Sequence, residues 1–378
     1  MDARQRYLET MRFGEPDRAF LLYPWLWAGT LERWHTEGLP PDVHVDEYFG
    51  TDRYETIPSV SGFLSLLPAP EREVLRVEGE TRIVRRAGEG QIIREFTNRP
   101  DLNMPQWLDY PLKSRDDWEQ KFKPLLNPYS PARYPLWWED YVASVQDRDY
   151  PLGVNAGSFF GWVRNWMGLE RLSYTMADDP MLVHEIVDYL AWFICETIHR
   201  ALDDVHPDFA LIWEDMAGKG GPLTSPRLFR EFQVPAYKKV TGLLHDHGVD
   251  VIMVDSDGFN DPLIPLWLEA GVTGLYPFEV AAGEDAVALR RQYGQSLMMY
   301  GNIDKRVLTQ GPEAIEREVL SKVPWLLTQG GYTPWIDHLV PPDVPFASFS
   351  HYQRLVNWVA EYPERALHEA RRRGFWVD

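Results

Sequence analysis

The sequence has a single cysteine, Cys195, among its 378 residues. One cysteine excludes an internal disulfide, and it excludes any zinc site built from several thiolates. Cys195 lies within the apolar helical pattern LAWFICETI, where inert packing is its expected role. We therefore expect the protein to work in a reducing, cytoplasmic setting.

Long apolar runs and an excess of basic residues are also missing. The most apolar early run, AFLLYPWLWAG at residues 19–29, is too short to span a bilayer, and the charged start of the chain does not resemble a secretory signal. Lysine and arginine number 38 against 57 aspartates and glutamates, so the formal net charge is −19. This charge argues against nucleic acid and against polyanionic ligands. We expect neither a membrane nor a nucleic acid as a partner.

From residue 150 onward, short apolar runs alternate with longer helical patterns. Such alternation is typical of parallel βα units. The sequence predicts parallel strands over 151–156, 209–214, 250–255, 272–276, 297–301 and 331–336. Residues 19–27 supply a seventh strand, and we expect an eighth somewhere within the first 150 residues.

The predicted helices between these strands have recognisable starts. Proline stands where the first helical residue belongs in Asp179-Pro180, Ser225-Pro226, Asp261-Pro262 and Gly311-Pro312. Three long helical patterns are expected over 225–248, 312–330 and about 348–373.

Residues 72–97 break this rhythm, because they alternate in polarity and turn at glycines. We expect them to form an antiparallel hairpin or meander insertion. No linker rich in Pro, Gly or Ser divides the chain, so residues 1–378 are predicted to form one α/β domain, a (β/α)₈ TIM barrel with an N-terminal antiparallel β excursion. The main alternative is an open doubly wound sheet, which usually carries a Gly-rich turn after its first strand. WLWAGTLERW contains no such turn.

Polar side chains follow the predicted strands at their carboxyl ends, where barrel enzymes build their active sites. They are Asn155, Glu214 with Asp215, Asp255 with Asp257, Glu279, Asn302 with Asp304, and Asp337 with His338. Any one of them could shape a turn, cap a helix or form an ion pair, but the whole series indicates a shared ligand site. The candidate catalytic residues are Glu214, Asp215, Asp257 and His338. The candidate substrate-binding residues are Asn155, Trp162, Arg164, Glu279 and Asn302.

Three segments resemble the signature of the uroporphyrinogen decarboxylase (URO-D) superfamily. GPLTSPRLFREFQVPAYKKV resembles its G-x-L-S-P-x-x-F-x-x-F-x-x-P-Y segment, YGNIDKRVL resembles G-N-L-D-P-x-x-L, and DHLVPPDVPF is similar to the ending G-H-G-I-x-P-x-T-P-x-x-N. The order and spacing agree from about residue 150 to 360. The resemblance implies a (β/α)₈ barrel, commonly a homodimer. It also implies one of two chemistries, cofactor-free decarboxylation of uroporphyrinogen or zinc-dependent methyl transfer involving a corrinoid or coenzyme M.

The chain departs from the decarboxylases of that superfamily near its first strand. They carry a basic R-Q-A-G-R-Y stretch that grips the carboxylates of the porphyrinogen, whereas PWLWAGTLERW keeps Gly29 and neither arginine of that motif. A polycarboxylate substrate needs such cations. FGTD makes Asp52 a loose counterpart of the decarboxylases' catalytic aspartate, and His338 matches the late histidine of the family.

The chain also departs from the methyltransferase branch, which has H-x-C-G where this sequence reads VDSDG, and a late cysteine that is missing here. Asp255 and Asp257 occupy the histidine and cysteine positions. The metal ligands implied by the resemblance are therefore Asp255, Asp257 and His338, with Glu214 as a further oxygen donor, for zinc first and iron or manganese next. Without a metal, such carboxylates suit proton transfer.

These observations favour an enzyme that acts on a small aromatic or methylated molecule. Metal-assisted methyl transfer is the leading interpretation, with a divalent metal and a corrinoid protein as the implied cofactor and partner. Decarboxylation of the uroporphyrinogen type is the alternative. A non-catalytic binding barrel that has kept the pocket is the second alternative.

Overall fold

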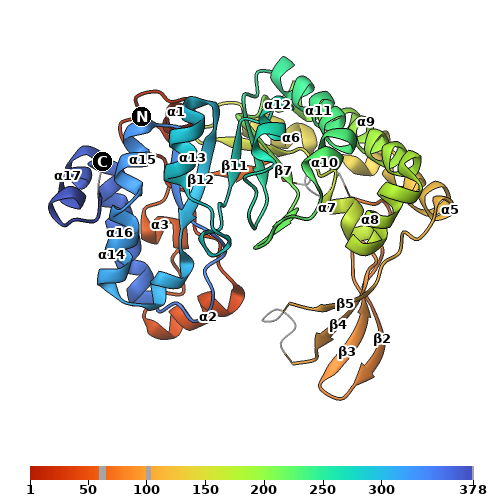
Figure 1. Cartoon of the computed structure of the whole chain (residues 1–378), viewed down its shortest axis with the longest axis horizontal. Helices are drawn as coiled ribbons and strands as arrows, with labels where there is room; N and C mark the ends of the chain where they lie inside the picture. The colour runs from red at the N-terminus through yellow and green to blue at the C-terminus, as the bar shows by residue number, and fades with distance from the viewer. Residues whose placement is uncertain (59–64, 99–103, 377–378) are drawn as a thin grey trace.

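A curved sheet of seven parallel strands forms the centre of the computed structural model, which describes residues 1–58, 65–98 and 104–376 (Figure 1). The strand order is β1-β6-β7-β10-β11-β12-β13. The strands are β1 (Glu55–Thr56), β6 (Leu152–Asn155), β7 (Phe209–Trp213), β10 (Val251–Asp255), β11 (Gly274–Tyr276), β12 (Met298–Ile303) and β13 (Tyr332–Ile336). All the strands predicted after residue 150 are present and parallel. The fold is an α/β fold of the TIM-barrel type.

Residues 19–27 run between the two edges of this sheet. Leu26 makes a parallel bridge to Val340, and the Val340 N–H donates to Trp25 O at 2.8 Å. At the other end of the segment, the Asp52 N–H donates to Leu21 O at 2.9 Å. Between these points, residues 22–25 and 51–55 separate around a cavity of about 930 Å³. The predicted seventh strand is thus an extended segment that pairs at its two ends.

Helices pack on the outer face of the sheet (Figure 1). They are α7 (Gly161–Met167), α8 (Leu169–Asp178), α9 (Pro180–Val205), α10 (Pro226–Phe232), α11 (Val234–Asp246), α12 (Ile264–Glu269), α13 (Ala286–Tyr293), α14 (Pro312–Leu320), α15 (Val323–Gln329), α16 (Phe346–Glu361) and α17 (Pro363–Arg372). Among the described residues, no helix combines the length and the apolar character needed to cross a bilayer.

Three of the four predicted helix starts are confirmed. Helices α9, α10 and α14 begin at the expected prolines, and the side chains of Asp179 and Ser225 accept hydrogen bonds from the first turns of α9 and α10. The start at Pro262 is wrong, because α12 begins at Ile264.

Each of the three long predicted helices is in fact two helices. The breaks lie at Gln233, at residues 321–322 and at Tyr362, in each case one or two residues before a proline. Proline has no N–H to donate, and it disfavours the helical conformation of the residue before it.

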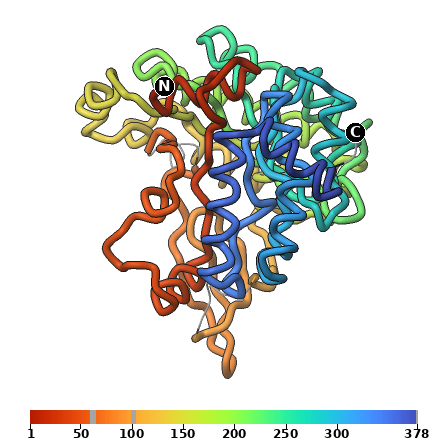
Figure 2. The backbone as a smooth tube through the Cα atoms, turned by 90° about the vertical axis from the view of Figure 1, so that its left-hand side faces the viewer, coloured from red at the N-terminus to blue at the C-terminus, as the bar shows by residue number. Residues whose placement is uncertain are grey.

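Helix α1 (Ala3–Met11) lies against the amino ends of the strands, at the end of the molecule opposite the antiparallel sheet that projects from it (Figure 2). Its residues Tyr7 and Met11 join Phe20 and Phe209 in the buried cluster inside the curved sheet. The Gly331 N–H donates to Thr10 O at 2.9 Å. Ion pairs Arg4–Asp208 and Arg12–Asp250, both 2.8 Å, tie the helix to residues just before β7 and β10.

A four-stranded antiparallel sheet projects from the body (Figure 1). We call it the arm, and it consists of β2 (Glu73–Glu78), β3 (Thr81–Arg85), β4 (Ile92–Phe96) and β5 (Gln106–Asp109). The alternating segment 72–97 contains the first three strands, and β5 was not expected. Pro70 and Pro111 both lie beside Gly90, so the two ends of the arm are close together.

The remaining helices of more than five residues are α2 (Ala28–Glu37) and α6 (Trp138–Ser144) in the described part of the chain. Helix α3 (Val45–Phe49) is one short turn beside the cavity of about 930 Å³. These helices belong to the first 150 residues, where the βα rhythm is irregular.

Candidate active site at the carboxyl ends of the strands

Alternation along the strands decides which side chains reach the inside of the sheet. On β10, Val251 and Met253 belong to the inner buried cluster, whereas Ile252 and Val254 pack outward under the helices. Successive side chains point to opposite faces of a strand, so Asp255 follows Met253 inward. The last inward positions of β7, β10, β11 and β13 are Trp213, Asp255, Tyr276 and Trp335.

A cavity of about 270 Å³ lies at these strand ends. Its walls carry three carboxylates and one imidazole among three indole rings. We call it the aspartate cavity, and it is lined by Trp25, Trp213, Asp215, Asp255, Asp257, Pro277, Trp335, His338 and Leu339. Four of the predicted site residues, Asp215, Asp255, Asp257 and His338, therefore meet at one place.

Asp215 is held by the backbone of β10 and by an arginine behind the cavity. The N–H groups of Glu214 and Asp215 both donate to Asp255 O, at 2.8 and 3.2 Å. Arg164 Nη2 donates to Asp215 Oδ2 at 3.0 Å, and its Nη1 donates to the Asp215 carbonyl. Burial raises the pKa of Asp215, although Arg164 opposes this. Arg164 therefore positions Asp215 and does not itself line the cavity.

The side-chain carboxyl of Asp255 has no hydrogen-bond or ion-pair partner among the residues that the structure describes. Burial raises the pKa of its carboxyl well above the usual range, and the negative charges of Asp257 and Asp215 add to the effect. Both effects favour the protonated form of this carboxyl. Asp255 is thus placed to donate a proton, or to be ionised by a cation that enters the cavity.

Asp257 faces His338, with Asp257 Oδ2 and His338 Nε2 3.4 Å apart. The loop that carries Asp257 is held by other groups. The Asn260 side-chain amide donates to Ser256 O at 2.7 Å, and the Gly258 N–H donates to Glu279 Oε2 at 3.2 Å. Because these contacts shape the turn, the Asp257 carboxylate is left to face the cavity.

The cavity fits a divalent metal in part. A spacing of 3.4 Å between an oxygen and a nitrogen is close to that of two ligands of one tetrahedral ion with bonds of about 2.1 Å. Asp255 does not complete a three-ligand group with this pair. Within the described residues, the three side chains whose ligand atoms all lie within 4.8 Å of one another are His199, Asp203 and His247, on α9 and just beyond α11. Asp255 would have to turn toward Asp257 and His338 to bind the same ion.

Glu214, a predicted catalytic residue, points away from the aspartate cavity. Its fully buried carboxylate accepts hydrogen bonds from Ser158 Oγ at 3.0 Å and from Tyr237 Oη at 2.7 Å. Three backbone N–H groups, of residues 159–161, donate to it at 2.8 to 2.9 Å. Burial raises the pKa of Glu214, and these donors act in the opposite direction. Its carboxylate fixes the turn that leads from β6 into α7.

Two predicted substrate-binding residues lie near this turn and outside the cavity lining. Asn155 Oδ1 accepts from the Gly157 N–H at 2.9 Å, so its amide is used in the turn after β6. Trp162 stacks on Trp166, with ring centroids 6.1 Å apart. Both side chains therefore support the backbone around α7.

The loops that follow β11 and β12 are held by three polar residues, Asn302, Asp304 and Asp337. The Asn302 amide donates to Phe278 O and Glu284 O, both at 3.0 Å. Asp304 accepts from the Arg306 N–H at 2.9 Å as a helix cap. Asp337 accepts from the N–H groups of residues 280 and 305, and burial raises its pKa to about 6.

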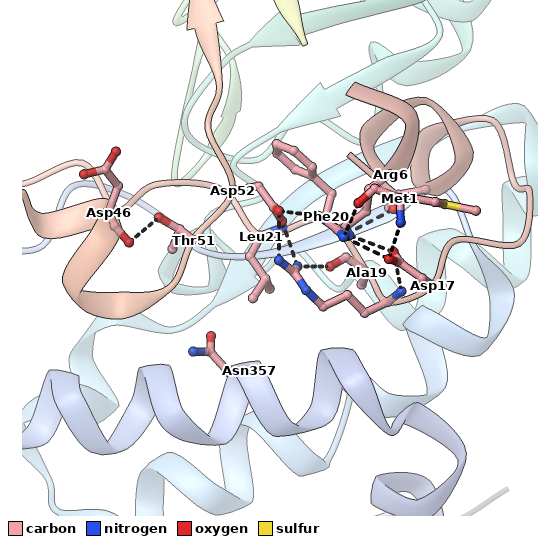
Figure 3. A network of polar contacts seen from close by, with 12 residues as sticks. Met1, Arg6, Asp17, Ala19, Phe20, Leu21, Asp46, Thr51, Asp52 and Asn357 are labelled. Carbon is pink, nitrogen blue, oxygen red and sulfur yellow. Dashed lines mark hydrogen bonds and ion pairs between the residues drawn. The ribbon is translucent and has the colours of Figure 1, made fainter. Parts of the chain in front are cut away.

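Asp52, the loose counterpart of a decarboxylase aspartate, is held in a network of ion pairs (Figure 3). Arg6 Nη1 and Arg18 Nη1 each donate to its carboxylate at 2.7 Å. The Leu21 N–H donates to Asp52 Oδ2 at 2.9 Å. Both carboxylate oxygens are occupied, so Asp52 fastens residues 18–21 to the segment before β1.

The sequence did not single out the three tryptophans of the cavity. Trp213 and Trp335 lie on the strands at the last inward positions, and Trp25 reaches the cavity from the extended segment 19–27. Trp25 and Trp335 meet edge to face, with ring centroids 4.9 Å apart. For Trp213 the available signal was its position in the alternation of β7, two residues after Leu211 and four after Phe209.

Comparison with known proteins adds three findings. The family model described as uroporphyrinogen decarboxylase (URO-D) matches residues 114–362. A curated uroporphyrinogen decarboxylase of Sodalis glossinidius (strain morsitans) is 28% identical over 149 residues, which are 38% of this chain and 40% of that relative's length. The solved structure of a methyltransferase from Methanosarcina mazei has a TM-score of 0.60 at 13% identity and covers 95% of this chain and 99% of its own. At that identity the likeness shows a shared fold.

Proposed function

This chain belongs to the uroporphyrinogen decarboxylase family, and from that premise we propose that it transfers a methyl group of a small organic molecule bound in the aspartate cavity. The observation that carries the proposal is the lining of this cavity, where three carboxylates and His338 stand at the carboxyl ends of the strands. Barrel enzymes place their reacting groups at these ends.

The lining disfavours the decarboxylation of a polycarboxylate. Among the described residues that line the aspartate cavity there is no lysine or arginine, and three aspartates would repel the substrate's own carboxylates. The cavity of about 930 Å³ includes Arg53, but its guanidinium is paired with Glu55 at 2.6 Å. A substrate with many negative charges would find no unpaired lysine or arginine among the described residues that line these two cavities.

The residues present can perform the proton steps of a demethylation. A neutral ether or thioether that loses its methyl group to an external nucleophile leaves as an anion and takes up a proton, whereas an ammonium donor leaves as a neutral amine that keeps the electron pair of the broken bond. Protonated Asp255 is placed to give this proton, and the Asp257–His338 pair is placed to replace it. For a neutral donor, a divalent metal held by Asp257, His338 and Asp255 would supply Lewis acidity at the heteroatom, whereas an ammonium nitrogen has no lone pair for a metal. A corrinoid or a thiol as the methyl acceptor is part of the proposal.

The experiment is a paired assay of the purified protein. Small methyl ethers, thioethers and methylamines are incubated with cob(I)alamin, and methylcobalamin formation is followed by absorbance. Uroporphyrinogen is assayed in parallel for coproporphyrinogen. We expect methylcobalamin from at least one methylated compound and no coproporphyrinogen.

Variants assign the activity to the cavity. Asp257→Asn and His338→Gln should each lower the rate by about 100-fold or more, as loss of an acid–base group does. Asp188→Asn, on the exposed surface of α9, is the matched control and should keep the rate. Coproporphyrinogen formation by the unaltered protein would overturn the proposal in favour of decarboxylation. Ligand binding with neither product would favour a binding barrel.

The eight-stranded barrel belongs to the same proposal. We take residues 19–27 as the strand that would complete the barrel beside the seven strands of the sheet, because they pair with Val340 at one end and with Asp52 at the other. The N–H groups of Val340 and Asp52 should then exchange slowly with deuterium. Exchange as fast as that of an exposed loop would leave the sheet open between its first and last strands.

A further inference from the structure

The aspartate cavity holds more carboxyl groups than its own residues pair. Of its three carboxylates, that of Asp215 is paired with Arg164 at 3.0 Å, and Asp257 faces His338 at 3.4 Å. Asp255 has no partner in the described part of the chain. Carboxylates withdrawn from water need a counter-charge or hydrogen bonds. A positively charged occupant would meet this need.

Three indole rings show what kind of cation suits the cavity. Trp25, Trp213 and Trp335 all line it. A bare metal ion binds through oxygen, nitrogen or sulfur donors, and indole faces give it none. An ammonium ion that carries methyl groups gains from both features, because aromatic faces attract its charge and its methyl groups are apolar.

The rings are held in place by contacts within the protein. Trp335 Nε1 donates to Tyr23 O at 3.1 Å, and Trp335 packs edge to face with Trp25. Trp213 already accepts a cation, since the Arg164 guanidinium lies 5.6 Å from its ring centroid. The polar edge of Trp335 is thus satisfied, and the rings keep their position without a ligand.

The volume of the cavity limits the number of atoms in the ligand. A volume of about 270 Å³ holds about ten non-hydrogen atoms, at roughly 30 Å³ for each. This suits a trimethylammonium group with a short substituent. The overall charge of −19 also raises the local concentration of small cations.

We infer that the aspartate cavity binds a small organic cation with N-methyl groups, held between the indole faces of Trp25, Trp213 and Trp335 and the carboxylates of Asp255 and Asp257. The inference rests on the proposed function, for which it names the class of methyl donor. It assigns Trp25 to ligand recognition and makes the charge of the ligand, rather than its shape alone, the basis of selection.

The test compares two probes of equal shape. Choline carries a trimethylammonium group, and 3,3-dimethylbutan-1-ol carries a neutral tert-butyl group in its place. Their binding to the metal-free, full-length protein is measured by isothermal titration calorimetry. We expect choline to bind at least about tenfold more tightly than the neutral alcohol. Equal affinity for the two probes, or binding of neither, overturns the inference.

Variants separate the rings from the carboxylates. Trp25→Leu should weaken choline binding by about 5- to 30-fold, in the range of a desolvated cation–π contact. Trp192→Leu is the matched control, because Trp192 on α9 is 39% exposed, as Trp25 is, and lies outside the cavity lining. Asp257→Asn should weaken choline binding and leave the neutral alcohol unchanged. An equal effect of the two tryptophan variants on choline binding also overturns the inference.

The outcome of the binding test does not depend on the outcome of the methyl-transfer assay, so each hypothesis can fail alone. Methyl transfer from a neutral ether, without selective choline binding, keeps the proposed function and overturns the cationic ligand. Selective choline binding without methyl transfer from any donor keeps the ligand class and overturns the reaction. Zinc binding that lowers choline affinity in proportion to its occupancy supports the inference, because both cations then use the same carboxylates.

Discussion

Glu214 and Asp215 are neighbours in the sequence, and their side chains have different surroundings. Glu214 accepts hydrogen bonds from a serine, a tyrosine and three backbone N–H groups, whereas Asp215 lines the aspartate cavity. The two carboxylates therefore differ in what their loss would change. One is needed for the fold, and the other is available to a ligand.

Glu214→Gln should destabilise the protein by about 2–4 kcal/mol, because the new NH₂ group faces donors where an acceptor is required. Chemical denaturation measures the change in the free energy of unfolding. Asp257→Asn is the comparison, and it should change this free energy by less than about 1 kcal/mol while it removes metal or ligand binding. Equal stability of the two variants would contradict the distinction between a structural and a functional carboxylate.

Counting along the strands could have separated these residues from the sequence. From Phe209, the inward positions of β7 are 209, 211 and 213, and the same two-residue step continued past the end of the strand reaches Asp215 and omits Glu214, although Asp215 has a φ of 46°. The same count on β10 gives Asp255 and Asp257. It fails at Asn302, whose φ of 60° ends the alternation of β12. The aromatic wall formed by Trp25 was not predictable, since Trp25 lies on no regular strand.

At the scale of elements, Asn302 holds the connection between β11 and α13. Its side chain donates to the carbonyls of Phe278 and Glu284 and accepts from the Ala286 N–H at 3.0 Å. The connection carries Glu279, which holds the Gly258 N–H in the Asp257 loop. The position of Asp257 thus depends on a residue that does not line the cavity.

Asn302→Ala should destabilise the protein by about 2–4 kcal/mol, because it removes three buried hydrogen bonds and puts alanine at a positive φ. Asn302→Gly loses the same bonds without the conformational strain, so it should be more stable than the alanine variant by about 1 kcal/mol. Thermal unfolding gives the order of the variants, and hydrogen exchange over residues 278–286 shows whether the connection loosens. An alanine variant as stable as the glycine variant would show that strain at this position is negligible.

The parallel strands were predictable because buried runs between helices have a distinct pattern. β1 was not, since Glu55 and Thr56 are two polar residues that gain their strand geometry only by pairing with Leu152 and Gly153. The helix breaks before Pro235, Pro324 and Pro363 were predictable from the sequence, because proline disfavours a helical conformation in the residue before it.

At the scale of the whole molecule, the arm is nearly independent of the site. Among the described side chains, Glu89 and Gln91 form hydrogen bonds with Asn165 at 3.0 Å each, and at the base of the arm Asp109 and Glu95 accept from Lys113 and Arg72. No arm residue lines the aspartate cavity. The two ends of the arm are close together beside Gly90, so a short linker can replace it.

Replacement of residues 73–109 by a short Gly-Ser linker should leave a folded protein whose free energy of unfolding falls by about 1–3 kcal/mol, the range for a few lost hydrogen bonds. Choline affinity should stay within about twofold of that of the intact protein, because the cavity is unchanged. Circular dichroism and calorimetry on the same sample check both statements. Loss of cooperative unfolding would show that the arm is needed for the barrel-like body to fold.

Helix α1 has its partners far along the chain, at Asp208, Asp250 and Gly331. During synthesis it leaves the ribosome before β7, β10 and β13 have been translated. Contacts of such long sequence separation form late, because the intervening loop must close first. Until then, Tyr7 and Met11 have no pocket to enter, and the amino ends of the strands stay open to other apolar segments. Helix α1 is thus made before its partners are complete, and a chaperone that shields it would act until residue 331 has emerged.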